Sequence, residues 1–169
     1  TNNEIRSIAF DGSNNMYVGG NFDTAGGISA SRIARWNGIN WSAIGAGTSG
    51  FVQAIEPIGN YLYVGGNFSI AGNQTVNRIA RYNMTNSTWE TLGTGLSGNV
   101  NAITTDGTYI YVGGTFDTAS DNGSINKIVN NLARWSTSNG WQALGTNTNV
   151  GVNIRVNSLA FTKNNTELI

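Results

Sequence analysis

Cysteine and histidine are both absent from this chain of 169 residues. Without Cys there can be no disulfide, no thiolate metal site and no Cys nucleophile. Without His, Ser-His-Asp and Cys-His catalytic arrangements are impossible, and so are zinc and copper sites built from the usual ligands. The composition therefore excludes several large enzyme classes, and we expect no catalytic residue, no bound metal and no cofactor.

Charged residues are also scarce, at 11% of the chain, against roughly 25% in an average soluble protein. Nine basic residues balance nine acidic ones, with no basic cluster. Neutral residues supply the polarity instead, with 26 Asn, 23 Gly, 18 Thr and 14 Ser. This charge pattern favours neither a nucleic-acid partner nor an anionic membrane. No apolar run is long enough for a membrane-spanning helix, so we expect no membrane insertion.

The chain does contain an internal repeat. The string "YVGGNF" at 17–22 returns at 63–68 and, as "YVGGTF", at 111–116. Four landmarks recur in a fixed order. They are an apolar stretch (5–10, 52–57, 100–105, 156–161), the "YVGG" segment, a segment like "RIARW" (32–36, 78–82, 131–135) and one like "WSAIG" (41–45, 89–93, 141–145). The resulting units are 5–51, 52–99, 100–155 and an incomplete 156–169.

Each landmark has the alternation of a β-strand. In the first stretch, Arg6, Ile8 and Phe10 share one face, and the residues between them share the other. Turn sequences such as "DGSNN" and "NGIN" separate the landmarks. In the first unit, strands are expected near 5–10, 16–22, 31–36 and 40–45. No segment has the 3.6-residue period of a helix.

Four short antiparallel strands in units of ~40–50 residues are typical of a β-propeller blade. The predicted fold is all-β, a partial propeller over residues 1–169 with three blades and the first strand of a fourth. Three blades do not close a ring, because rings usually have 4–8. Partners are therefore expected to be the remaining blades of a longer chain or further copies of this one.

The double Gly of each "YVGG" segment is predicted to be structural. Gly lets backbones approach closely, as they must where blades crowd towards the propeller axis. A phosphate-binding turn would require a following helix, and none is predicted. The glycines at these repeat positions are Gly19, Gly20, Gly65, Gly66, Gly113 and Gly114.

The order of Gly-Gly, an aromatic residue and then Trp41, Trp89 or Trp141 resembles the kelch repeat. The longer strings "YVGGNFDTAGG" and "RIARWNG" are similar to repeat arrays of large surface proteins. Such arrays occur in bacteria, in giant viruses and in fungal cell-polarity proteins like the cortical marker family. The resemblance implies a propeller and a surface location. Galactose oxidase-like propellers of the kelch type hold copper through His and Tyr, with a Tyr crosslinked to Cys, and these positions have no counterpart here.

One Arg per unit, at Arg35, Arg81 and Arg134, is unusual in so uncharged a chain. Such a residue must reach water or find partners. We favour partners in a neighbouring blade, with Asp23 and Asp117 as candidates. The alternative is a ring of Arg that lines the central opening and meets an anionic ligand.

The remaining polar features are interpreted as turns and surface. Asp11 and Asp106 each precede Gly in a hairpin, so they are expected to form turns. The polar insertion at 120–131 is predicted to be an exposed loop. In "NMTNST", Asn83 and Asn86 are the most plausible N-glycosylation acceptors if the chain is exposed to that machinery.

The leading functional hypothesis is a non-catalytic scaffold or adhesion module of an extracellular, cell-surface or virion-surface protein. Other surface proteins or glycans are possible partners. One alternative is a carbohydrate-binding module that uses Trp or Tyr platforms. Another is a non-catalytic part of a larger propeller enzyme whose active site lies in other blades. The final strand lacks partners within the three blades, so we expect the isolated chain to self-associate.

Overall fold

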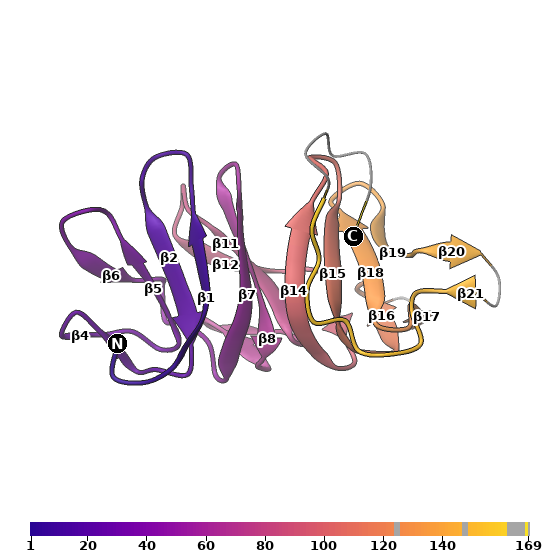
Figure 1. Ribbon diagram of the computed structural model, residues 1–169, viewed down its shortest axis with the longest axis horizontal. Coiled ribbons are helices and arrows are strands. Elements are labelled where there is room, and N and C mark those ends of the chain that lie inside the picture. Colours follow the sequence, from indigo (N-terminus) through magenta and orange to yellow (C-terminus); the bar gives the residue numbers. More distant parts are fainter. Residues whose placement is uncertain (124–125, 147–148, 162–167, 169) are drawn as a thin grey trace.

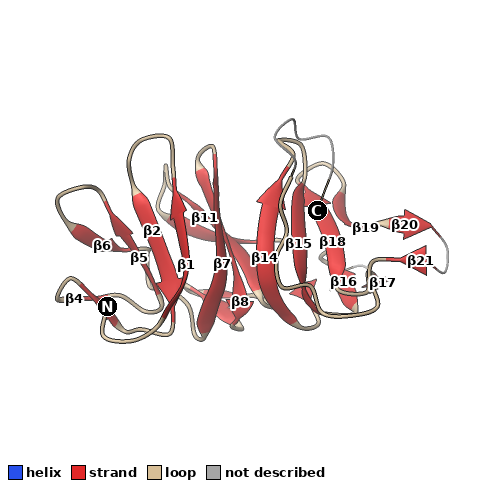
Figure 2. Ribbon diagram, viewed as in Figure 1, coloured by secondary structure: helices blue, strands red, loops and turns tan. Residues whose placement is uncertain are grey.

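The computed structural model describes residues 1–123, 126–146, 149–161 and 168. Three four-stranded antiparallel sheets stand side by side along the molecule (Figure 1). The described residues form strands, turns and loops and no helix (Figure 2), so none of them forms a helix that could cross a membrane. The predicted all-β fold of four-stranded blades is confirmed.

Each blade is a meander of four strands that pair in chain order. Blade 1 consists of β1 (Ile5–Phe10), β2 (Met16–Gly20), β5 (Ile33–Trp36) and β6 (Trp41–Ala43). Blade 2 consists of β7 (Phe51–Ile58), β8 (Tyr61–Asn67), β11 (Ile79–Asn83) and β12 (Thr88–Thr91). Blade 3 consists of β14 (Asn99–Thr105), β15 (Ile110–Thr115), β18 (Leu132–Ser136) and β19 (Gly140–Ala143). The strands expected in the first unit are therefore present.

Short hairpins that the sequence pattern did not predict lie between the second and third strands of each blade. They are β3 (Thr24–Ala25) with β4 (Ile28–Ser29), β9 (Ile70–Ala71) with β10 (Gln74–Thr75), and β16 (Thr118–Ser120) with β17 (Lys127–Ile128). In the third, β13 (Gly95–Leu96) adds a strand to β16. A further pair, β20 (Gly145–Thr146) and β21 (Asn149–Val150), follows blade 3.

The insertion at 120–131 corrects the expectation of a simple exposed loop. Its ends belong to the hairpin β16–β17, and Ser120 and Val129 are buried. The carboxylate of Asp121 accepts hydrogen bonds from the backbone N–H of Trp141 at 2.9 Å and from Lys127 Nζ at 2.8 Å. The insertion lengthens a hairpin that the other blades also have, so its ends pack while Asn122 and Asn126 stay exposed.

The core lies mainly between blades. The Phe of each "YVGG" landmark, Phe22, Phe68 and Phe116, is fully buried. The lead segment of the fourth unit follows the same plan, because Val156 lies against Gly113 as Val52 lies against Gly19 and Val100 against Gly65. The N–H of Val156 also donates to the carbonyl of Gly114 at 3.0 Å. Residues 155–160 are nevertheless not in a strand, and Phe161 makes only an isolated bridge to Leu168. Residues 162–167 and 169 of this predicted strand and turn lie outside the described part of the chain.

Candidate functional site

The glycine pairs are places where a side chain would not fit. A methyl group at Gly65 would overlap Val100, which begins the lead strand of the next blade. A methyl group at Gly66 would overlap the backbone carbonyl of Phe51 in its own blade. The same two neighbours recur for the other pairs, with Val52 and Glu4 near Gly19 and Gly20, and Val156 and Asn99 near Gly113 and Gly114. None of these six glycines has a positive φ, so close approach is their role.

Each repeated Arg lies in a row that crosses its blade. In blade 2, Arg81 pairs in register with Tyr63 on β8 and with Glu90 on β12. Its Nε donates to Glu90 Oε2 at 2.8 Å, and an Nη atom lies 2.7 Å from the same oxygen. Burial acts to lower the pKa of Arg81, but its hydrogen bonds to Tyr63 and Glu90 and its charge interactions with them outweigh this effect and raise the pKa. We call each such set a Tyr–Arg row.

Arg81 also reaches the following blade. Its guanidinium lies over the rings of Tyr61, at 4.2 Å, and Trp135, at 5.4 Å, and donates to Thr137 at 3.4 Å. Trp135 and Thr137 belong to blade 3, so an inter-blade role exists for this Arg. Its partners there are an aromatic ring and a hydroxyl group rather than a carboxylate.

The proposed carboxylate partners of these Arg residues were wrong. Asp23 lies 3.2 Å from Arg32, so its ion pair is with a different Arg. Asp117 makes no ion pair within the described residues. Arg134 donates instead to Gln142 at 2.9 Å, within its own blade, and lies over the ring of Tyr109. The repeat places the acceptor on the adjacent fourth strand, a register that the sequence alone did not reveal.

The repeated Trp residues differ in burial between blades. Trp89 and Trp141 are buried, and the indole N–H of Trp141 donates to the carbonyl of Leu92 in blade 2 at 2.8 Å. The equivalent Trp41 of blade 1 is only half-buried and packs against Trp36, with ring centroids 5.5 Å apart. A Trp at this repeat position is thus buried where a preceding blade packs against it.

The hairpin acids form turns, as predicted, and have one further contact. Asp106 Oδ1 accepts from the N–H groups of Thr108 and Tyr109, and its Oδ2 accepts from the hydroxyl of Tyr111 at 2.8 Å. Burial acts to raise the pKa of Asp106, but these hydrogen bonds outweigh it and lower the pKa. Asp11 binds Tyr17 in the same way, so a carboxylate ties the first hairpin to the "YVGG" strand.

A second set of polar residues accepts hydrogen bonds from the backbone of the short hairpins, and the sequence pattern did not reveal it. Ser97 Oγ accepts from the N–H groups of Asp117 and Thr118, each at 3.0 Å. Ser49 binds the N–H groups of Ser69 and Ile70 in the same way. The "SG" that precedes the lead strands of blades 2 and 3 was the available signal.

A cavity of about 570 Å³ lies beside the beginnings of the lead strands. At the same repeat position it receives one polar residue from each unit, namely Arg6, Gln53, Asn101 and Asn157; Glu4, Ile5 and Arg155 complete the lining. In β1, β7 and β14 these residues are the extra residues of β-bulges. The bulge directs a polar side chain into this cavity, which we call the lead-strand cavity.

Some of the polar side chains that line the lead-strand cavity already have hydrogen-bond partners. Arg6 donates to Glu4 at 2.9 Å, and Asn101 Nδ2 donates to the carbonyl of Val156 at 2.8 Å. Gln53, Arg155 and Asn157 make no side-chain hydrogen bond within the described residues. The cavity therefore offers amide and guanidinium donors to a polar ligand.

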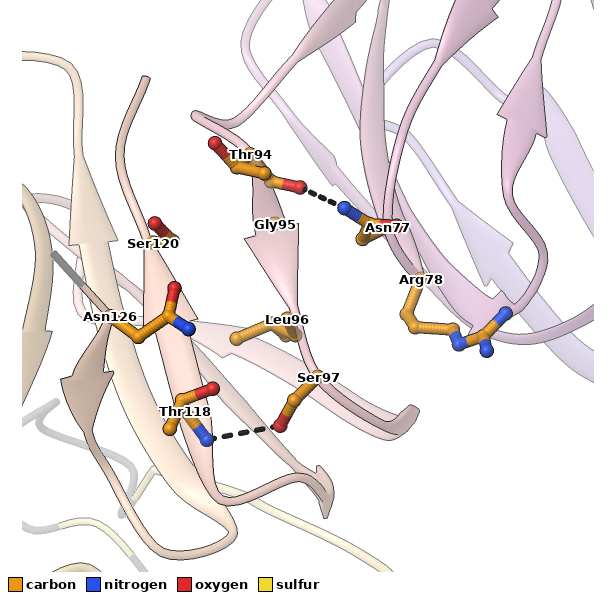
Figure 3. Close-up of a pocket in the computed structure, with 9 residues that line it drawn as sticks. All are labelled: Asn77, Arg78, Thr94, Gly95, Leu96, Ser97, Thr118, Ser120 and Asn126. Carbon is orange, nitrogen blue, oxygen red and sulfur yellow. Dashed lines mark hydrogen bonds between the residues drawn. The ribbon is translucent and has the colours of Figure 1, made fainter. Parts of the chain in front are cut away.

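Figure 3 shows a second hollow, of about 310 Å³, between blades 2 and 3. Its polar groups already serve the structure, because Asn77 Nδ2 donates to the carbonyl of Thr94 at 2.7 Å and Ser97 binds Thr118. Arg78 extends to the side away from Asn126 (Figure 3). This arrangement joins two blades rather than presenting a reactive group.

The other predicted sites are mostly occupied by local contacts. The amide of Asn83 donates to Glu90 at 3.2 Å, and its oxygen accepts from the N–H of Thr85. Asn86 is exposed, although its oxygen accepts from Thr88. Among the described residues, no three acidic side chains gather in a way that could hold a metal ion.

Comparisons place these features among known proteins. The family model of the Rax2 C-terminal beta propeller domain matches residues 54–169, which is more than half of the chain. No curated protein gave a match. Among solved structures, the extracellular domain of a putative one component system of B. thetaiotaomicron aligns with 93% of this chain at 18% identity and a TM-score of 0.48. The chain spans 24% of the length of that structure.

Proposed function

This chain belongs to the family of Rax2 C-terminal beta propeller domains, and on that premise we propose that it is a non-catalytic segment of a larger propeller in a surface protein. Its role is that of a scaffold that docks further blades and offers the lead-strand cavity to partners. An extracellular, cell-surface or virion-surface location is part of the proposal, as is the absence of a catalytic centre. The likeness to kelch repeats and to surface arrays of particular organisms stays a prediction.

The observation that carries the proposal is an uncovered blade face. An apolar row of Phe10, Met16, Trp36 and Trp41 crosses blade 1, and Ile8 lies on the same face. We call these five residues the open face of blade 1. Ile8 is 56% exposed and Phe10 66% exposed.

The equivalent faces of the other blades are covered. Ile55 of blade 2 and Ile103 of blade 3, which correspond to Ile8, are only 6% and 8% exposed. The cover is the Tyr–Arg row of the preceding blade, since Tyr17 contacts Met84 and Tyr63 packs against Trp135. The interface between blades thus occurs twice inside this chain, and its apolar half occurs a third time without cover.

We infer that the occupant of the open face is another blade with a Tyr–Arg row. Several exposed apolar side chains on one face mark an interaction surface in a soluble protein. A blade has the right chemistry, because it supplies apolar area together with an Arg that can lie over the aromatic rings. Such a blade comes from a longer chain or from a second copy of this one.

The experiment is sedimentation velocity over a concentration series. The 169-residue chain is expected to self-associate, and Ile8→Asp and Phe10→Asp are expected to make it monomeric, because a charge on this face would lose hydration without gaining a partner. Ile128→Asp is the matched control, since Ile128 is exposed on the distant hairpin strand β17 and its change should leave association intact.

A second arm separates the two sources of the covering blade. Fusing a copy of residues 52–99 before residue 1 covers the open face with a Tyr–Arg row of the same chain and leaves the apolar face of the copy uncovered instead. Self-association of this fusion should therefore no longer respond to Phe10→Asp. Equal association of the parent chain and Phe10→Asp, or a monomeric parent at high concentration, would contradict the docking proposal.

A carbohydrate-binding role is the second candidate, and the lead-strand cavity favours it. Amide and guanidinium donors suit the hydroxyl and acidic groups of sugars. A glycan array read with the parent chain and with Gln53→Ala tests this. Binding that survives Gln53→Ala, or no binding at all, would count against the cavity as a sugar site.

A further inference from the structure

The Tyr and the Arg are the same in all three Tyr–Arg rows, and the residue on the fourth strand differs. The residue on the fourth strand opposite Arg is Glu90 in blade 2 and Gln142 in blade 3. In both, a side-chain oxygen accepts from the Arg Nε, at 2.8 Å and 2.9 Å respectively. In blade 1 the opposite residue is Ser42, whose side chain ends two atoms earlier along the chain than that of Glu or Gln. The acceptor carbonyl or carboxyl group is therefore absent from blade 1.

This leaves Arg35 with an unmet donor. Its Nε is buried and has no hydrogen-bond partner among the described residues. A buried guanidinium N–H without an acceptor is costly, and hydrogen bonds to charged groups are the strong ones. Arg35 forms no ion pair within the described residues either. Arg35 thus has a buried donor group for which the described residues provide no acceptor.

A cavity occupies the place of the missing carboxyl group. It measures about 150 Å³ and lies between blades 1 and 2, lined in part by Tyr17, Arg35, Ser42, Tyr82, Met84 and Ser87. None of its lining residues is acidic. The volume is far more than one water molecule needs, since ~10–15 Å³ on this measure is enough for a water.

Asp11, the acid that contacts Tyr17 of this cavity, is already engaged. Asp11 accepts from the hydroxyl of Tyr17 and from Ser13 and Asn15, and it does not line the cavity. Arg35 therefore gives this cavity, which we call the Arg35 cavity, a positive charge. The hydroxyls of Ser42 and Ser87 are further polar groups on its wall.

We propose that the Arg35 cavity binds the carboxylate group of a small organic acid or of an acidic sugar, which takes the place that the carboxylate of Glu90 has in blade 2. Guanidinium and carboxylate groups match as planar, bidentate partners. Few non-hydrogen atoms fit the cavity, so the Kd is expected to be on the order of millimolar.

The first experiment measures thermal unfolding of the whole chain in sodium acetate, with sodium chloride at equal ionic strength as reference. Acetate should raise Tm along a saturable curve, because a ligand that binds only the folded state stabilises it. Sodium glucuronate separates the two sources: a tighter response than acetate indicates an acidic sugar, and an equal response indicates a small organic acid. An equal rise in chloride, or no saturable rise in either carboxylate, would overturn the proposal.

Variants supply the matched controls. Ser42→Glu should fill the cavity with the carboxylate found in blade 2, raise Tm without ligand and weaken the acetate response at least about tenfold, as loss of a carboxylate–Arg contact would. Ser29→Glu, on the exposed end of β4 and outside the lining of the cavity, should keep the response, since it adds the same carboxylate elsewhere. Arg35→Gln should lose it, and if that variant fails to fold, Ser42→Glu still decides.

The converse change tests the idea by gain of function. Glu90→Ser in blade 2 removes the internal acceptor of Arg81 and should create a second carboxylate site. Titration with ¹³C-acetate, followed by NMR, should then show two bound acetates for each chain rather than one. A response that stays undiminished in Ser42→Glu, with no added site in Glu90→Ser, would refute the assignment to the Arg35 cavity.

Discussion

Replacing Gly65 by Ala tests how the repeated "GG" holds adjacent blades together. The new Cβ would overlap Val100 Cγ1 and would lie 2.8 Å from Val100 Cβ and 3.1 Å from Ile103 Cδ1. Both contacts are with side chains of the next lead strand, and Val100 is fully buried. Overpacking of this kind costs about 1–3 kcal/mol, of which roughly 0.4–1 is offset by the reduced entropy of the unfolded chain.

The clash at Gly65 can be relieved by a second substitution, so a double-mutant cycle tests its cause. Val100→Ala alone removes two methyl groups from a filled site and should cost about 2 kcal/mol. In the double variant the methyl group added at position 65 moves into the space that Val100 vacates. The two costs should therefore fall short of additivity by about 1–2 kcal/mol.

Gly66→Ala and Gly12→Ala are the comparison variants for this experiment. A methyl at Gly66 would meet the carbonyl oxygen of Phe51, which is backbone, so Gly66→Ala should cost more than Gly65→Ala, and Val100→Ala should not rescue it. A methyl at Gly12 would have no other group within 4 Å, so Gly12→Ala should change stability by less than about 0.5 kcal/mol.

Urea unfolding, followed by Trp fluorescence, gives the four free energies of the cycle. Each kcal/mol also corresponds to a Tm change of about 2–4 °C in a chain of this size. Strict additivity of Gly65→Ala and Val100→Ala would refute the claim that Gly65 exists to admit Val100.

Three further predictions concern other sites. Trp141→Phe should lower the unfolding free energy by about 1 kcal/mol more than Trp89→Phe, because the Trp141 indole N–H has a hydrogen-bond partner and the Trp89 indole N–H has none among the described residues. Asp106→Asn should destabilise the protein at pH 7, with the difference in stability shrinking below about pH 4, because the folded-state pKa of Asp106 is lowered. Glu56→Gln should stabilise the protein at pH 7, because burial raises the pKa of Glu56. Thermal melting measured across a pH series checks both. Expressed through a eukaryotic secretory pathway, the chain should lose one glycan mass with Asn86→Gln, since Asn86 is exposed.

The repeat alone determined the architecture. Strands alternate with a period of two and turns need Gly, Asn and Asp, so four landmarks repeated three times specify four-stranded blades before any contact is known. The role of the "GG" pair as a site of close approach followed from the same local chemistry, since only Gly lacks a Cβ. The turn roles of Asp11 and Asp106 are equally local, because an Asp side chain binds its own backbone two or three residues on.

Only the tertiary structure decided the partners of the charged residues and the cavities. Arg81 meets Glu90 because β11 and β12 pair in a particular register, and a carboxylate nine residues away looks no different in sequence from one in another blade. The polar residues Arg6, Gln53 and Asn101 converge because each forms a bulge in a different blade. The Arg35 cavity appears only when Ser42 is compared with Glu90 in space, because a missing side chain matters only where the surrounding blades leave its volume empty.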